Sequence, residues 1–157
     1  MTMPDSRRLR TRRRLLQAGG ALSIVPWLRV GAAAADLPDM PALSAFLAGR
    51  TPRSERVRLL LPQLADNGQA VPMKVVIDGP FAPGPHVSAI HLFSETNPVP
   101  EMAVFEFPGP VERIEVESRL RLANTQRIVA VAAMSDGTLY SAVAEVIVTL
   151  AGCLDGT

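Results

Sequence analysis

The sequence predicts an all-β fold, and three observations support this prediction. From about residue 54 onward, apolar residues occur in short runs with a period nearer two than 3.6, which is typical of strands with one buried face. Asn, Gly and Pro separate these runs, and Asp136-Gly137 is a two-residue hairpin signal. Seven runs at such spacing indicate an immunoglobulin-like antiparallel sandwich of two sheets.

A short helix is expected before the strands, over Ala42–Ala48. Leu43, Phe46 and Leu47 fall on one helical face, and Gly49 follows. The seven strands are then expected at Val57–Leu61, Val71–Asp78, His86–Ser94, Met102–Phe107, Ile114–Ala123, Arg127–Ser135 and Tyr140–Leu150.

The run from Ile114 to Leu122 has the clearest alternation. Its even-numbered positions are Ile114, Val116, Leu120 and Leu122 apart from Ser118, and its odd-numbered positions are Glu115, Glu117, Arg119 and Arg121. Because successive side chains of a strand point to opposite faces, the apolar set is expected in the core and the charged set in water.

The first 35 residues are expected to be a twin-arginine signal peptide. Arg12 and Arg13 lie in Thr-Arg-Arg-Arg-Leu-Leu-Gln, an apolar stretch follows from Ala18 to Val30, and small residues end at Ala35, where cleavage is expected to within about three residues. The stretch is shorter than the roughly 20 apolar residues of a membrane span, so no anchor is expected. A basic arm that binds nucleic acid is the alternative, but such arms are not followed by an apolar run. Export to the periplasm is therefore expected.

Removal of the signal changes the charge of the chain. Residues 1–35 hold seven of the 16 basic residues and one of the 15 acidic residues, which leaves nine basic and 14 acidic residues and a net charge of −5. The rest of the chain has no basic patch of the kind that binds nucleic acid, so this function class is excluded. One domain is expected over residues 36–150, followed by a flexible arm over residues 151–157.

Cys153 is the only cysteine, and it follows the last expected strand. A single unpaired thiol in an exported protein calls for an explanation, and covalent attachment of a substrate is the one favoured here. Asp155 and the terminal carboxylate favour the neutral thiol, which suits a carrier that is activated inside a partner enzyme rather than a catalyst. The arm around the thiol consists of Ala151, Gly152, Leu154, Asp155 and Gly156.

Other candidate chemistry in the sequence is sparse. His86 and His91 fall on opposite faces of one expected strand, and no cluster at metal-site spacing accompanies them, so no metal site is expected. No nucleophile elbow, phosphate loop or dinucleotide fingerprint is present, so no catalytic residue is assigned. The expected protein is not an enzyme and has no cofactor other than a sulfur species on Cys153. An incidental tail cysteine without a role is the alternative.

Several motifs resemble the SoxY family, the sulfur-carrier subunit of the periplasmic thiosulfate-oxidising Sox system. The resemblance covers about Leu43 to Cys153 and rests on the order of five motifs along the chain: Leu64-Ala65-Asp66-Asn67-Gly68 with Val71-Pro72, Asn97-Pro98-Val99-Pro100, residues 119–126 (RLRLANTQ), Asp136-Gly137, and a final strand that runs into a cysteine preceded by glycine. It implies an immunoglobulin-like fold, a heterodimer with a SoxZ-like subunit, and transfer of sulfur intermediates on Cys153 between Sox enzymes that include c-type cytochromes and a sulfate-thiol hydrolase.

The tail departs from the family pattern. The family usually ends Gly-Gly-Cys-Gly-Gly, whereas Ala151, Leu154 and Asp155 replace three of these glycines here. Either the partner enzymes have wider channels, or the chain is a divergent paralogue that serves another pathway. A second function class also stays open, namely a non-covalent periplasmic binding or scaffold module with a vestigial tail, for instance one associated with a quinoprotein dehydrogenase.

Overall fold

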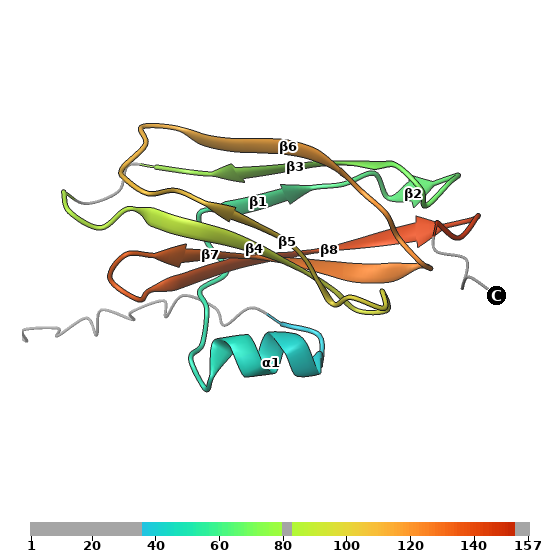
Figure 1. Cartoon of the computed structure of the whole chain (residues 1–157), viewed down its shortest axis with the longest axis horizontal. Coiled ribbons are helices and arrows are strands. Elements are labelled where there is room, and N and C mark those ends of the chain that lie inside the picture. Colours follow the sequence, from blue (N-terminus) through green and yellow to red (C-terminus); the bar gives the residue numbers. More distant parts are fainter. Residues whose placement is uncertain (1–35, 80–82, 153–157) are drawn as a thin grey trace, which may run out of the picture.

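The computed structural model describes residues 36–79 and 83–152, where one short helix precedes eight strands (Figure 1). The strands form two facing sheets, and the protein is an immunoglobulin-like β-sandwich, which confirms the predicted fold class. The elements are α1 (Pro41–Leu47), β1 (Val57–Leu60), β2 (Leu64–Ala65), β3 (Val71–Ile77), β4 (Val87–Ser94), β5 (Glu101–Glu106), β6 (Ile114–Leu120), β7 (Gln126–Met134) and β8 (Leu139–Val148).

The smaller sheet has the order β1-β3-β6 and the larger has the order β2-β8-β7-β4-β5. Every pairing is antiparallel except that of β2 with β8, which is parallel. The register of β3 with β6 runs without a shift from Val71 opposite Leu120 to Ile77 opposite Ile114. Among the described strands, β6 and β5 therefore lie at sheet edges on the same side of the sandwich, where a cleft separates them.

The core between the sheets contains alternate side chains from both layers. Val71, Met73 and Val75 of β3 face Ile128 and other residues of the larger sheet, and all of them are buried. This alternation follows from the two-residue period of an extended strand. The apolar runs seen in the sequence thus become the inner faces of the two sheets.

Helix α1 covers the other face of the larger sheet, so the fold has a third layer (Figure 1). Leu43 is buried against a cluster that includes Phe93 and Val131, and the ring of Phe46 lies with its centroid 4.3 Å from that of His91. β4 and β7 are therefore buried on both faces, which explains why their apolar runs are nearly continuous rather than alternating. No helix in the described part of the chain is long and apolar enough to cross a membrane.

The turn between β7 and β8 has the predicted Asp136-Gly137 signal at its tip. Gly137 has φ +85°, a backbone conformation that glycine adopts without the clash that a Cβ causes. The side chain of Asp136 accepts a 2.9 Å hydrogen bond from the amide of Thr138, and this bond lowers the pKa of the Asp136 carboxyl. The hairpin prediction is confirmed.

The seven predicted strands are all present, with ends that differ by a few residues. The strand predicted over Ile114–Ala123 ends at Leu120, and the one predicted over Tyr140–Leu150 ends at Val148. The alternation of the first is confirmed, because Ile114, Leu120 and Leu122 are buried whereas the side chains of Glu117, Arg119 and Arg121 are exposed. The eighth strand, β2, was not predicted, because two residues are too few to show a period.

Candidate functional site

The predicted site residues Cys153, Leu154, Asp155 and Gly156 lie outside the described residues, as do Arg12 and Arg13 of the expected signal. The structure follows the chain to Gly152, the residue before the cysteine. The candidate site is therefore described from its base, the segment Thr149–Gly152 and the loops that contact it, called here the tail anchor. Ala151 is half-buried and Gly152 is buried.

The segment after β2 holds the end of β8 and the residues that follow it. The amide of Thr149 donates a 3.1 Å hydrogen bond to the carbonyl of Ala65, and the amide of Gly68 donates a 2.8 Å bond to the carbonyl of Leu150. The hydroxyl of Thr149 also donates to the carbonyl of Asp66 at 2.7 Å. These bonds position the last residues before the cysteine against the Asp66–Gly68 turn.

Gly152 makes the closest contact of the tail anchor. Its amide donates a 2.8 Å hydrogen bond to the carbonyl of Leu122, whose own amide donates a 2.7 Å bond to the carbonyl of Gly68. A Cβ on Gly152 would lie 2.2 Å from the Gly68 oxygen, and a Cβ on Gly68 would lie 2.3 Å from the Leu122 oxygen. Both glycines are required by close backbone approach. A flexible arm was predicted from Ala151 onward, whereas the structure holds Gly152 in place.

The loop between β4 and β5 braces the same region through Asn97. Its side-chain nitrogen donates a 2.7 Å hydrogen bond to the carbonyl of Arg121, and its oxygen accepts a 2.9 Å bond from the amide of Ala123 and a 3.0 Å bond from the side chain of Gln126. Gln126 in turn accepts a 2.5 Å bond from the buried hydroxyl of Ser94. Asn97 thus fixes the segment that contains Leu122, the partner of Gly152.

Two further contacts complete the anchor. The hydroxyl of Thr125 accepts a 3.0 Å hydrogen bond from the amide of Val148, near the end of β8. Glu95, at the start of the loop that contains Asn97, forms a 2.6 Å ion pair with Arg127 of β7. The hydrogen bonds from Arg127 hold the pKa of the Glu95 carboxyl below its usual range.

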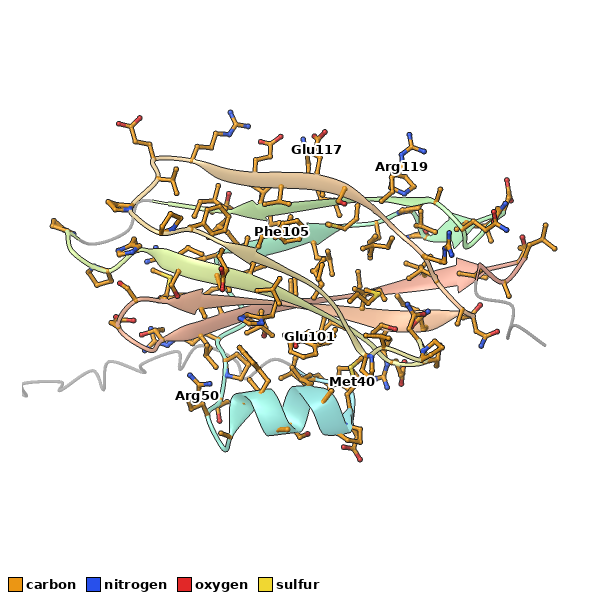
Figure 2. The ribbon with its side chains drawn as sticks, viewed as in Figure 1. Met40, Arg50, Glu101, Phe105, Glu117 and Arg119 are labelled. Atoms are coloured by element: carbon orange, nitrogen blue, oxygen red, sulfur yellow. The ribbon has the colours of Figure 1, made fainter. Side chains whose placement is uncertain are left out.

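A cleft of about 530 Å³ opens beside the anchor, between β5 and β6. Met102, Ala103 and Phe105 of β5 line one side of the cleft, and Leu120 of β6 lies on the other. The segment Asn97–Val99 closes one end. Phe105 is labelled in Figure 2. The apolar lining results from the open edge of the sandwich, where none of the described strands joins the two sheets.

The two histidines lie in separate environments. His86 precedes β4, and its ring nitrogen Nδ1 lies 3.4 Å from the carbonyl oxygen of Gly84. His91 lies under helix α1, with its Nδ1 2.7 Å from a carboxylate oxygen of Glu101. Within residues 36–79 and 83–152, no three His, Cys, Asp or Glu side chains are grouped so that they could hold a metal ion.

Sequence reasoning identified the motifs that form the anchor but not their association. In the sequence, Asn97–Pro100 and Gly68 stand between apolar runs and belong to motifs of the family resemblance, with no indication that they form a site. In the structure the Asp66–Gly68 turn, Asn97 and the segment 121–126 all contact one another or the tail anchor. The hydrogen-bonding capacity of Asn and Gln gives no indication of a partner more than 20 residues away, so the sequence held no local signal for this arrangement.

Comparison with known proteins supplies the family. The model of the family described as sulfur oxidation protein SoxY matches residues 43–153. No curated protein matches the chain.

Two solved structures are similar in fold. A putative superoxide reductase from Thermotoga maritima has a TM-score of 0.50 and 16% identity, covering 60% of this chain and 87% of its own. A superoxide reductase (neelaredoxin) from Ignicoccus hospitalis has a TM-score of 0.47 and 18% identity, covering 60% and 81%. At this identity the likeness to the Thermotoga protein concerns the fold alone.

Proposed function

The chain belongs to the SoxY family of sulfur oxidation proteins, and on this basis we propose that it is a periplasmic sulfur carrier whose Cys153 binds sulfur intermediates covalently. Family membership supports a role in sulfur oxidation by the Sox system, with other Sox proteins as partners. The finer parts of the proposal are export through Arg12 and Arg13, a heterodimer with a SoxZ-like subunit, and thiosulfate as the source of the carried sulfur.

The observation that carries the proposal is the fixed position of Gly152. The residue immediately before the thiol is hydrogen-bonded to Leu122 and lies against Gly68. Cys153 follows this fixed residue in the sequence, so a partner enzyme that docks on the body meets the base of the carrier arm at a set position. This arrangement suits a carrier that several enzymes must recognise in turn.

The proposed chemistry starts from the thiolate of Cys153. Its sulfur forms an S–S bond with the outer sulfur of thiosulfate, and the two electrons and the thiol proton leave to a partner c-type cytochrome and to solvent. Water then attacks the sulfonate sulfur in a partner hydrolase, which breaks the bond to the sulfane sulfur, releases sulfate and leaves a persulfide on Cys153. The partners supply the oxidant and the hydrolytic site, and this chain supplies the nucleophilic sulfur.

Mass spectrometry of the intact protein tests the carrier role. Protein purified from its native periplasm without reductant is expected to carry adducts with the mass of one sulfur atom or of a thiosulfonate, and dithiothreitol should remove them. Cys153→Ser should lack both the adducts and thiosulfate-dependent oxidation while keeping the circular dichroism spectrum of the wild type. Full oxidation activity of Cys153→Ser would contradict the carrier role and favour a non-covalent scaffold.

Co-expression with the SoxZ-like subunit tests the heterodimer. A 1:1 complex is expected in size-exclusion chromatography under reducing conditions, and Cys153→Ser should form it equally well because the thiol is not needed for docking. Separate elution of the two subunits would reject this part of the proposal and leave the carrier chemistry untouched.

A further inference from the structure

The edge strand β6 and the two residues that follow it have a symmetric sequence. Residues 114–122 read Ile-Glu-Val-Glu-Ser-Arg-Leu-Arg-Leu, so that apolar and charged positions mirror each other about Ser118 while the sign of the charge reverses. The acidic pair precedes Ser118 and the basic pair follows it. An antiparallel second copy of this strand would therefore present opposite charges at each mirrored position.

The backbone of β6 has one side open to such a partner. Leu122 directs both its amide and its carbonyl toward Gly68 and Gly152, on the side of β3. Because these groups alternate between the two sides of a strand, the odd-numbered residues direct theirs to the opposite side. The bond from Asn97 to the carbonyl of Arg121 agrees with this direction, and it occupies that carbonyl, so the open part of the edge runs from Glu115 to Arg119. In the described part of the chain, no strand pairs with β6 on that side.

The charged side chains of β6 project from the outer face of the smaller sheet, and Figure 2 shows Glu117 and Arg119 pointing away from the larger sheet. Lys74 on β3 contacts the carboxylates of Glu115 and Glu117 at 2.5 and 2.7 Å. Among the described residues, neither Arg119 nor Arg121 forms a salt bridge. The basic half of the strand thus lacks the counter-charges that the acidic half has.

We propose that two copies of this protein associate through β6, antiparallel and in the register centred on Ser118. Glu117 then lies opposite Arg119 of the second copy and Glu115 opposite Arg121, each pair occurring twice. The outward-directed backbone groups of Glu117 and Arg119 form the new ladder, while the carbonyl of Arg121 keeps its bond to Asn97. The two smaller sheets then become one continuous sheet of six strands. Opposite charges directly across an antiparallel pair stabilise it.

The charges also exclude the neighbouring registers. A shift of two residues in one direction places Glu117 opposite Glu117 on the symmetry axis, and a shift in the other direction places Arg119 opposite Arg119. A shift of one residue sets the apolar face of one copy beside the charged face of the other. Charges on an edge strand usually prevent association, but here the reversal of sign at Ser118 makes one register favourable.

The proposed dimer separates the two tail anchors. Leu122 lies four residues from Ser118, so the Leu122 residues of the two copies lie about eight residues apart along the paired strands, or about 27 Å at ~3.4 Å per residue. The two tail anchors thus lie at opposite ends of the interface. This association is therefore distinct from a disulfide between the tails, and it can be tested in a Cys153→Ser background.

Charge reversal with sedimentation equilibrium tests the proposal. In the Cys153→Ser protein we expect a reversible dimer that weakens as the ionic strength approaches about 1 M, where the Debye length is about 3 Å. Arg119→Glu and Glu117→Arg should each weaken it about tenfold or more, because both place like charges opposite each other twice. An equimolar mixture of the two variants should dimerise again, since each then meets its complement. Glu145→Arg, the same charge change on exposed β8, is the control and should leave the dimer unchanged.

Arg119→Glu breaks no salt bridge within the described residues, so a loss of association in this variant is not explained by loss of folding if its thermal unfolding stays cooperative. A Cys153→Ser protein that stays monomeric at high concentration would overturn the proposal. Reversal variants that associate as well as the parent would do the same.

Crosslinking at the symmetry axis gives an independent test. Ser118→Cys in the Cys153→Ser background should oxidise to a disulfide-linked dimer, because the two residues at position 118 form a non-hydrogen-bonded pair with Cα atoms about 4.5 Å apart. Glu145→Cys in the same background is the matched control and should remain monomeric. If Ser118→Cys instead crosslinks only to a cysteine placed on the SoxZ-like subunit, the β6 edge belongs to that partner and the proposal fails.

Discussion

Gly68 and Gly152 meet so closely that neither position has room for a side chain, although 84 residues separate them in the sequence. The contact includes the carbonyl of Leu122, which accepts the amide of Gly152 at 2.8 Å. The glycine before the cysteine therefore has a packing role. The sequence analysis includes Gly152 in a flexible arm over residues 151–157, whereas in the structure this glycine is part of the tail anchor.

Gly152→Ala is expected to destabilise the protein by about 1–3 kcal/mol, because the new Cβ overlaps backbone atoms of Gly68 that cannot move independently. Urea unfolding measures this change. Gly109→Ala is the control, since a Cβ at Gly109 meets no atom within 4 Å. Equal stability of the two variants would show that the tail anchor does not contribute to the fold.

Asn97→Ala is expected to cost about 1–3 kcal/mol, because the amide of Ala123, the carbonyl of Arg121 and the side chain of Gln126 lose their partner together. Asn124→Ala, an exposed change in the segment that Asn97 braces, should be nearly neutral. Hydrogen exchange provides the second measurement, with faster exchange expected at the amides of Ala123 and Gly152 in Asn97→Ala only. Unchanged protection at Gly152 would separate the Asn97 loop from the anchor.

The ion pair of Glu95 with Arg127 predicts a pH dependence. The pKa of Glu95 is lowered in the folded protein by the hydrogen bonds from Arg127, so the pair stabilises the fold above the ordinary glutamate value of 4.5, and this contribution is lost as the pH falls below it. Glu95→Gln should therefore be less stable than the wild type at pH 7, and the difference should shrink as the pH falls from 4.5 through the lowered pKa of Glu95 in the folded protein. Glu112→Gln removes an exposed carboxylate that forms no ion pair within residues 36–79 and 83–152, so it should differ little from the wild type across this pH range. A constant difference between Glu95→Gln and the wild type across this range would contradict the assignment.

The tail prediction concerns residues beside the thiol. Leu154→Gly combined with Asp155→Gly should raise or leave unchanged the turnover with enzymes from a standard Sox system, because a slimmer arm enters a narrow channel more easily. Turnover with the partners of this chain and with the standard enzymes should be measured side by side. A loss of turnover with both sets would show that Leu154 and Asp155 contribute contacts of their own.

The fold class followed from the sequence because burial in a sandwich imposes a period that one strand displays by itself. Residues 114–122 show this most clearly, and the structure confirms their inner and outer faces. β2 could not be predicted, since its two residues are defined by parallel pairing with Ile147 and Val148 of β8. The third layer was not predicted either. The packing of α1 against Phe93 depends on how the chain folds back over the larger sheet, and the sequence of the helix alone does not show this.

The candidate site was predictable only in part, for a similar physical reason. Cys153 is a candidate because it is the only thiol in the sequence, and it lies outside the described residues, so its role stays a prediction. The anchor consists of backbone hydrogen bonds among Gly68, Leu122 and Gly152, and such bonds can form between residues of any type. The resemblance identified the motifs that contain these residues, but only the structure shows that they meet.

The long pairing of β8 with β7 gives the protein mechanical strength at its carboxyl end. The two strands match at eight register positions, and β2 holds the other edge of β8 next to the tail anchor. A force applied to the tail along the axis of β8 acts on these hydrogen bonds in shear, so they share the load and do not open one at a time. Tension on the chain beyond Gly152 therefore acts on the whole β7–β8 ladder rather than on its last hydrogen bond alone.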